Sequence, residues 1–283
     1  MRIATINQRL CLIEGGGAID VHAASGGQFD AESAAIYPYW HEFTTWAASA
    51  DLPDPEPFAP EELGSPSPAP RQVFGIGLNY SDHVAESGFA RPDTNPPVFT
   101  KFPSCITGPY GDIALPAGGH TDWEVELAVI IGATAHQVSA AKAWDHVAGL
   151  SVGQDVSERI LQLATKPPQF SLGKSYPGFG PVGPWLVTPD EFDDPDDLEL
   201  SCLVNGEEMQ KARTSQLIFG VSELIEQLSQ VTPLLPGDIV FTGTPSGVGL
   251  GRDPQRWLAP GDVVTSYIEG IGQMRHTFVA APG

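Results

Sequence analysis

The stretch Asp122-Trp123-Glu124-Val125-Glu126-Leu127-Ala128-Val129-Ile130-Ile131-Gly132 places acidic residues at the start of a long apolar run. The run is rich in Val and Ile, which favours a β-strand. Residues two apart in a strand point to the same face, so Glu124 and Glu126 should present their carboxylates side by side. On this pattern, Val125 and Leu127 point the other way, into the core. We therefore expect a half-buried strand that carries two neighbouring carboxylates.

Two like charges on a half-buried strand repel each other, and each loses hydration, so a cation should offset them. A divalent ion with oxygen ligands meets that need. The alternative is a solvent-facing acidic edge, which is the more common meaning of an isolated Glu-x-Glu pattern. Asp155 follows a second apolar run and supplies a possible third carboxylate, although it could instead be a helix N-cap. Three carboxylates suit Mg²⁺ or Mn²⁺ rather than zinc, which prefers His and Cys.

A possible general base lies in Asn79-Tyr80-Ser81-Asp82-His83-Val84-Ala85-Glu86. If a short helix begins near Ser81, then His83 and Glu86 are three residues apart and share a face. A carboxylate beside an imidazole orients it and stabilises its charged form, which suits a base. The alternative is an ion pair on an exposed helix.

Lys174 lies in Gly173-Lys174-Ser175, which resembles the end of a phosphate-binding loop. The glycine that such a loop requires five residues earlier is replaced by Pro168, so we reject a nucleotide site. The chain has only 14 Lys and Arg residues, which makes a lysine between glycine and aromatic residues noteworthy. The segment 242–247 (TGTPSG) is a turn whose amides and hydroxyls could bind an anion.

The N-terminal part of the chain differs in texture from the rest. Residues 1–25 predict a β-hairpin, with strands at Arg2–Ile13 and Ala18–His22, and residues 31–50 predict a helix packed under it. We assign 1–50 to a small N-terminal domain. Residues 51–70 contain too much proline for a helix or a central strand, and they predict an extended connector or an ordered strap.

Residues 71–283 predict the main domain. Short apolar runs alternate with turns, and the chain contains 31 Gly and 27 Pro residues, which argues against a helical bundle. Helices are expected at Ala140–His146 and Ser215–Leu228, the latter with an amphipathic stripe. The fold class is therefore mixed α/β and β-rich, a β-roll or sandwich with peripheral helices.

Charge excludes several classes of partner. The net charge is −21, which disfavours binding to nucleic acid and to anionic membranes. No window approaches 18 continuous apolar residues, and the N-terminus does not resemble a signal peptide, so we expect a cytoplasmic protein. The three cysteines lack metal-binding spacing and are expected to be reduced.

Several of these segments, taken in order, resemble one family. A GxNY run followed by HxxE, a DxExEL strand, a QDxSxR segment, GKSY with GPVGPW, and GDIVFTGTPSGVG occur in this chain in the order seen in the fumarylacetoacetate hydrolase superfamily. Each motif is weak alone, but five in order are specific. The resemblance covers about residues 71–279, and it implies a mixed β-roll with one bound Mg²⁺ or Mn²⁺ per chain.

The resemblance also implies roles for individual residues. The metal ligands would be Glu124, Glu126 and Asp155, and His83 with Glu86 would activate water. Lys174 would meet the developing negative charge. The substrate's carboxylate and oxo groups would be held by Arg159, Gln162 and Thr244.

The implied enzyme is a metal-dependent hydrolase that cleaves a carbon–carbon bond in a small anionic 2-oxo or 2,4-dioxo acid of acylpyruvate or fumarylpyruvate type. The alternative activities are decarboxylation or isomerisation of oxo-diacids in the catabolism of aromatic compounds. A non-catalytic binding protein is disfavoured because all the expected ligands and the base are present. A homodimer is also implied. Pro177 and Glu158 replace the residues usual in the family, which leaves the identity of the substrate open.

Overall fold

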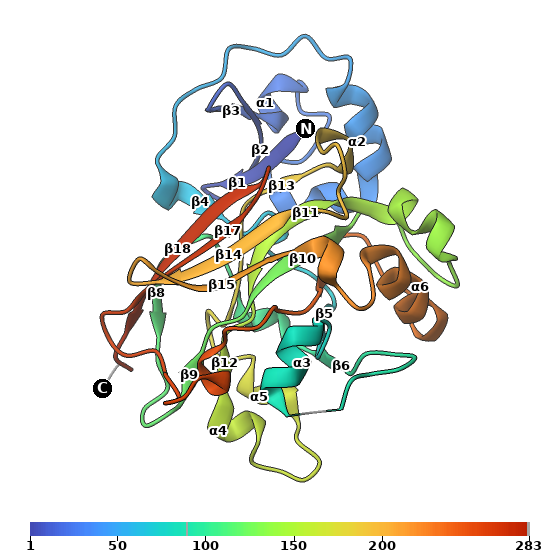
Figure 1. Cartoon of the computed structure of the whole chain (residues 1–283). Coiled ribbons are helices and arrows are strands. Elements are labelled where there is room, and N and C mark those ends of the chain that lie inside the picture. Colours follow the sequence, from blue (N-terminus) through green and yellow to red (C-terminus); the bar gives the residue numbers. More distant parts are fainter. Residues whose placement is uncertain (89, 282–283) are drawn as a thin grey trace.

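The computed structural model describes residues 1–88 and 90–281. Eleven of the described strands form one sheet, with the order β3-β2-β1-β13-β11-β10-β16-β5-β6, while β4 pairs with β1 and β7 pairs with β13 (Figure 1). These strands are β1 Arg2–Ile6, β2 Arg9–Glu14, β3 Gly17–Asp20, β4 Leu63–Gly64, β5 Val73–Ile76, β6 Val98–Thr100, β7 Ile106–Thr107, β10 Val125–Ile131, β11 Val147–Gln154, β13 Gly180–Val187 and β16 Ile239–Phe241.

A second sheet of five strands packs against the first, in the order β15-β14-β17-β18-β8. Its strands are β8 Tyr110–Ala114, β14 Glu199–Val204, β15 Glu207–Arg213, β17 Val263–Ile268 and β18 Gly272–Val279. A short ribbon pairs β9 Thr121–Asp122 with β12 Ser157–Glu158. The protein is therefore mixed α/β and rich in strands, as the sequence predicts.

The helices are short and lie around the sheets. The α-helices are α1 Val21–Ala24, α2 Trp40–Ala47, α3 Ser81–Ser87, α4 Arg159–Gln162, α5 Phe170–Gly173 and α6 Val221–Val231. The 3₁₀ helices are η1 Ser33–Tyr39, η2 Pro60–Glu62, η3 Pro103–Cys105, η4 Ala140–His146, η5 Pro189–Glu191, η6 Thr214–Gln216 and η7 Gly249–Gly251. Helices α3, α4 and α5 gather at one end of the large sheet, beside β9 and β12 (Figure 1).

Strand β10 is buried on both faces, which corrects the expectation of a half-buried strand. Val125, Leu127 and Val129 belong to the core between the two sheets. Ala128 and Ile130 belong to a second core, which includes Phe43 of α2 and Ile36 of η1. The alternation of the strand is present, but the N-terminal helices cover the face that would otherwise meet water.

The N-terminal segment extends the large sheet. Strand β1 pairs antiparallel with β13, with Ile3 opposite Leu186, so residues of the predicted small domain and of the catalytic part share one sheet. The predicted strand Arg2–Ile13 is wrong as a single strand, because Asn7 and Gln8 both have positive φ and form a tight turn between β1 and β2.

The predicted helices are present with different limits. The helix expected within 31–50 is divided into η1 and α2, with Pro38 inside η1. The helix expected from Ser215 begins only at Val221. Its N-cap is Gly220, whose amide donates to the carboxylate of Glu223. The short helix at Ala140–His146 is confirmed as η4.

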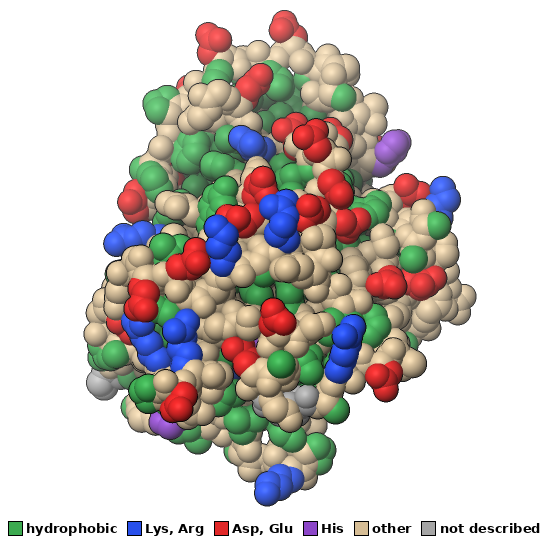
Figure 2. Space-filling model, viewed as in Figure 1, with side chains coloured by type: hydrophobic (Ala, Val, Ile, Leu, Met, Phe, Trp, Pro, Cys, Tyr) green, Lys and Arg blue, Asp and Glu red, His purple; other side chains and the backbone are tan. Residues whose placement is uncertain are grey.

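The acidic surface and the reduced cysteines agree with what the composition predicts. Acidic side chains are spread over the face shown in Figure 2 rather than gathered in one patch. Cys11, Cys105 and Cys202 are buried free thiols. Among the described residues, no helix combines the length and the apolar character needed to cross a bilayer.

Candidate metal and active site

Three buried carboxylates meet at one end of β10 and β11. Glu124 lies just before β10, Glu126 lies within it, and Asp155 directly follows β11. The register pairs Val125 with Gln154, and the amide of Asp155 donates to the carbonyl of Glu124 over 2.9 Å. One carboxylate oxygen from each of the three residues lies within 4.8 Å of the other two. Strand register therefore assembles the cluster that the sequence predicts.

Lys174 lies inside this cluster and is only 2% exposed. Its Nζ donates to Glu124 Oε2 over 2.6 Å, to Asp155 Oδ2 over 2.7 Å and to Ser157 Oγ over 2.7 Å. Lys174 is therefore not a surface lysine. All three protons of the ammonium are used within the protein.

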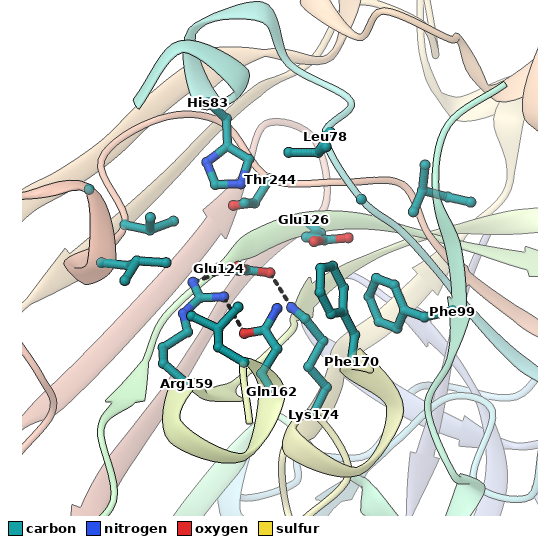
Figure 3. Close-up of a pocket in the computed structure, with 16 residues that line it drawn as sticks. Leu78, His83, Phe99, Glu124, Glu126, Arg159, Gln162, Phe170, Lys174 and Thr244 are labelled. Carbon is teal, nitrogen blue, oxygen red and sulfur yellow. Dashed lines mark hydrogen bonds and ion pairs between the residues drawn. The ribbon is translucent and has the colours of Figure 1, made fainter. Parts of the chain in front are cut away.

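Two further cations flank the carboxylates. Arg159 donates to Asp122 Oδ2 over 2.7 Å and to Glu124 Oε1 over 2.7 Å, and Figure 3 shows its guanidinium beside Glu124. Lys101, which is 1% exposed, donates to Asp155 Oδ1 over 2.6 Å and also to the carbonyl of Lys174. Each of these charges would be costly to bury without its partner.

The two strand glutamates have opposite electrostatic surroundings. Burial alone would raise the pKa of Glu124, but Lys174 and then Arg159 hold it below its usual range. Burial, Asp155 and Glu124 together raise the pKa of Glu126 well above its usual range. Glu126 accepts a hydrogen bond from the amide of Gly243 over 2.7 Å, and no ion pair joins it to a cation among the described residues. The negative charge of Glu126 is therefore the least compensated of the three.

The donor set fits a divalent ion. The described residues bring three carboxylates and no Cys or His ligand into this group, and such hard oxygen donors are those that Mg²⁺ and Mn²⁺ prefer. A positive charge at this point would also compensate Glu126, which Lys174 and Lys101 do not contact.

A histidine–carboxylate pair faces the cluster across a cleft. Nδ1 of His83 lies 2.8 Å from Oε1 of Glu86, both on α3, as the sequence predicts. His83 lines the same cleft as Glu124, Glu126, Arg159 and Lys174, and Figure 3 shows its ring pointing toward them. With Nδ1 held by Glu86, Nε2 is the nitrogen available to exchange a proton in the cleft.

One loop connects the two sides of the cleft. The amide of Gly247 donates to Glu86 Oε2 over 2.9 Å, and the amides of Gly249 and Leu250 donate to Asp122 over 2.6 and 3.0 Å. Asp122 in turn holds Arg159. The loop 247–251 therefore positions the histidine–carboxylate pair and the arginine in one arrangement.

The chain matches a family model along most of its length. The fumarylacetoacetate (FAA) hydrolase C-terminal model matches residues 72–279. The chain belongs to the fumarylacetoacetate hydrolase family. This confirms the resemblance that the sequence motifs indicate, and the fold described above is that of an enzyme family which includes hydrolases, isomerases and tautomerases.

Three similar proteins illustrate this range. An oxaloacetate tautomerase of Bos taurus is 46% identical over 209 residues, which is 74% of this chain and 66% of that protein, slightly less than two thirds of its length. A crystal structure described under the name HpcE from Mycobacterium smegmatis has a TM-score of 0.95 and 52% identity over the whole of both chains. A maleylpyruvate hydrolase from Sphingobium, crystallised with manganese(II) and pyruvate, has a TM-score of 0.81 and 29% identity, also over the whole of both chains.

The residues that the family resemblance assigns to substrate binding are present in the cleft but already have protein partners. The second amine of the Arg159 fork, Nη1, donates to Gln162 Oε1 over 2.8 Å, and Figure 3 shows the other end of this amide turned toward the cleft. The Thr244 hydroxyl donates to the carbonyl of Val125 and accepts from Gln210. Of these three residues, Gln162 has the group that is best placed to meet a ligand.

Sequence reasoning missed Lys101 and Asp122 as parts of the site. Lys101 directly follows the strand β6. Basic residues are scarce in this chain, and a lysine next to an apolar run could have been singled out for the same reason as Lys174. Asp122 opens the quoted acidic stretch, but nothing local indicates that it bonds Arg159 and the loop 247–251. Both contacts join segments that are distant in the chain.

The two departures from the family pattern have local explanations. Glu158 is the N-cap of α4, where its carboxylate accepts from the amides of Ile160 and Leu161 over 3.0 and 2.8 Å. Pro177 lies in an exposed turn and is not among the described residues that line the cleft. Neither residue points into the cleft to select a substrate.

Proposed function

We propose that this chain is a divalent-metal-dependent hydrolase that cleaves the carbon–carbon bond of a 2,4-dioxo acid of acylpyruvate type. The observation that supports this most is the His83–Glu86 pair facing the buried carboxylates across one cleft. Water attack needs a base on one side of the substrate, and enolate release needs positive charge on the other. The cleft has both.

Glu124, Glu126 and Asp155 would hold the ion. When bound, a divalent ion in this site would polarise the 2-oxo group of the substrate and compensate charge that develops on it. Mg²⁺ and Mn²⁺ both suit the three oxygen donors.

His83 accepts a proton from water through Nε2, and Glu86 stabilises the imidazolium that results. The water oxygen bonds to the 4-oxo carbon, and the bond between C3 and C4 breaks. Its electron pair passes to C3, which gives the enolate of pyruvate and a free carboxylic acid. The proton held by His83 then returns to C3.

Lys174 keeps positive charge beside the head of the substrate. Burial would lower its pKa, but Asp155 and Glu124 outweigh that effect and raise it, so the ammonium stays charged. Its contacts with Glu124 and Asp155 position both carboxylates. Its amine reaches the substrate only if one of these bonds is exchanged.

The second candidate is a keto–enol tautomerase of a 2-oxo diacid. It is favoured by the 46% identity with the bovine oxaloacetate tautomerase. The same histidine would move one proton between C3 and the 2-oxo oxygen of the substrate, and no carbon–carbon bond would break.

One assay separates the two. The purified full chain with Mg²⁺ or Mn²⁺ is supplied with acetylpyruvate, and pyruvate is measured with a coupled dehydrogenase. In parallel, the enol band of oxaloacetate is followed by absorbance. The hydrolase predicts stoichiometric pyruvate and acetate. Rapid loss of the oxaloacetate enol with no pyruvate from any acylpyruvate would replace the hydrolase by the tautomerase.

A further inference from the structure

Beyond its charged residues, the cleft is walled by hydrocarbon. The described lining residues outside the polar cluster are apolar, and the six with the largest side chains are Ile76, Leu78, Phe99, Leu163, Phe170 and Leu250. Most of them are only half-buried, and Leu163 is 39% exposed. When an apolar ligand covers half-exposed apolar side chains around one cleft, apolar surface is removed from water and binding is stabilised.

Leu78 is held in the wall by an unusual backbone. Its φ is +55°, in the left-handed region that a bulky residue rarely occupies. The next residue, Asn79, is fully buried and keeps the backbone in place, because its amide donates to the carbonyls of Phe219 and Thr242 and accepts from the amide of Phe219. The fold therefore maintains a strained conformation that leaves a leucine at the cleft.

Two phenylalanines form the opposite part of the wall. Phe99 and Phe170 meet edge to face, with ring centroids 5.6 Å apart, and Figure 3 shows both rings beside Lys174 and Glu126. The Phe99 ring lies so close to Gly75 that a Cβ there would be 2.2 Å from it. The absence of a side chain at Gly75 allows the ring to take this place.

Both cations at the cleft already pair with carboxylates of the protein. Lys174 bonds Glu124, Asp155 and Ser157, and Arg159 bonds Asp122, Glu124 and Gln162. No other Lys or Arg is present among the described residues that line the cleft. A second carboxylate on a substrate would therefore be buried against hydrocarbon without a counter-charge, in a protein whose net charge is −21.

We propose that the site selects 2-oxo acids with a single carboxylate and an uncharged hydrocarbon tail, and that Leu78, Phe99 and Phe170 contact that tail. The proposal rests on the proposed function for the position of the 2-oxo head, and it adds the chemical class of the remainder. It discriminates against diacids, in which the tail ends in a second carboxylate.

Binding of stable acids tests the tail without turnover. The matched pair is 2-oxohexanoate and 2-oxohexanedioate, which differ only in a terminal methyl or carboxylate. Calorimetric titration into the full chain with Mn²⁺ should give at least tenfold tighter binding of 2-oxohexanoate. Equal binding, or tighter binding of the diacid, would overturn the proposal even if the enzyme hydrolyses acylpyruvates.

A pair of variants places the preference on the wall. Leu78→Lys adds a cation at the cleft, and Leu78→Met keeps an apolar side chain of similar volume. The lysine variant should shift the ratio of the two dissociation constants toward the diacid by tenfold or more, and the methionine variant should retain the wild-type ratio. If both variants keep that ratio, Leu78 does not contact the tail and the proposal fails.

Turnover distinguishes this failure from failure of the proposed function. Butanoylpyruvate and succinylpyruvate differ at the same terminal position, and the pyruvate released from each is measured. A wild-type enzyme that releases pyruvate faster from succinylpyruvate supports the hydrolase but overturns the tail preference. A preference for 2-oxohexanoate in binding with no release from either substrate supports the tail preference but contradicts the hydrolase.

Discussion

Nζ of Lys101 donates to Oδ1 of Asp155 over 2.6 Å, and neither side chain is exposed to solvent. Removing one partner of a buried ion pair leaves the other charge without compensation. Lys101→Met should therefore lower the free energy of unfolding by on the order of 3 kcal/mol, measured in urea with a chelator present. Because a divalent ion bound at the proposed site would compensate the same carboxylate, the gain in melting temperature on adding Mn²⁺ should be larger in the variant than in the wild type.

The matched control for this variant is an exposed ion pair. Nζ of Lys142 lies 3.3 Å from Oδ2 of Asp145, and both side chains are more than half exposed. Lys142→Met should change stability by less than about 1 kcal/mol. Equal effects of the two substitutions would mean that Lys101 is not a structural support of the carboxylate cluster.

Glu126 offers the cleanest test of the metal site. Its carboxylate has Asp155 and Glu124 as neighbours, and its bond to the Gly243 amide can be kept by a glutamine oxygen. Glu126→Gln should abolish Mn²⁺ binding in a calorimetric titration, while the metal-free variant should be at least as stable as the metal-free wild type. One site per chain is expected for the wild type. Undiminished Mn²⁺ binding by the variant would contradict the assignment of this ligand.

Gly251 controls the position of the carboxylate that holds His83. A Cβ at this position would lie 2.7 Å from Glu86 Oε2, so the carboxylate would have to move. Gly251→Ala should lower kcat by on the order of tenfold to a hundredfold, because small displacements of a catalytic pair are costly. Gly220→Ala is the control, since a Cβ there meets nothing within 4 Å. If both variants lose activity equally, displacement of Glu86 is not the cause.

We expect His276, which lies outside the site, to make the free energy of unfolding sensitive to acid. Burial lowers its pKa to about 4, and its Nε2 is bonded to the carbonyl of Gly108. A histidine whose folded pKa is depressed contributes stability that is complete above the unfolded value near 6.5 and decreases as pH falls from there toward 4. The decrease should amount to about 3 kcal/mol for this residue.

Urea unfolding at several pH values between 7 and 4 measures this decrease. In His276→Gln the loss over this interval should be smaller by most of that amount. The exposed His41 provides the control, and His41→Gln should follow the wild-type curve. A His276→Gln curve parallel to the wild type would contradict the assigned protonation state.

Some features of the site were predictable because their signals are local. The alternation in β10, the spacing of His83 and Glu86, and the position of Asp155 after an apolar run are each contained in a few residues. The meeting of Asp155 with Glu124 and Glu126 depends on the register of β10 and β11. The family resemblance implied this set of residues, and local pattern alone did not.

The parts that escaped prediction depend on contacts between distant segments. The full burial of β10 requires Phe43, from a segment that the sequence assigned to a separate domain. The partners of Arg159 include Asp122, which also accepts from the loop 247–251. The positive φ of Leu78 depends on the bonds that Asn79 makes with Phe219 and Thr242. None of these relationships has a periodicity or a spacing that a sequence displays.

His83, held by Glu86, is the proposed base of a hydrolysis at this cleft. Steady-state release of pyruvate from an acylpyruvate by His83→Asn, with Mn²⁺ at saturation, measures this role. We predict that kcat/KM falls by about two to four orders of magnitude, while Mn²⁺ affinity stays at the wild-type value. Pyruvate release within a few-fold of the wild-type rate, with Mn²⁺ bound normally, would mean that His83 is not the base.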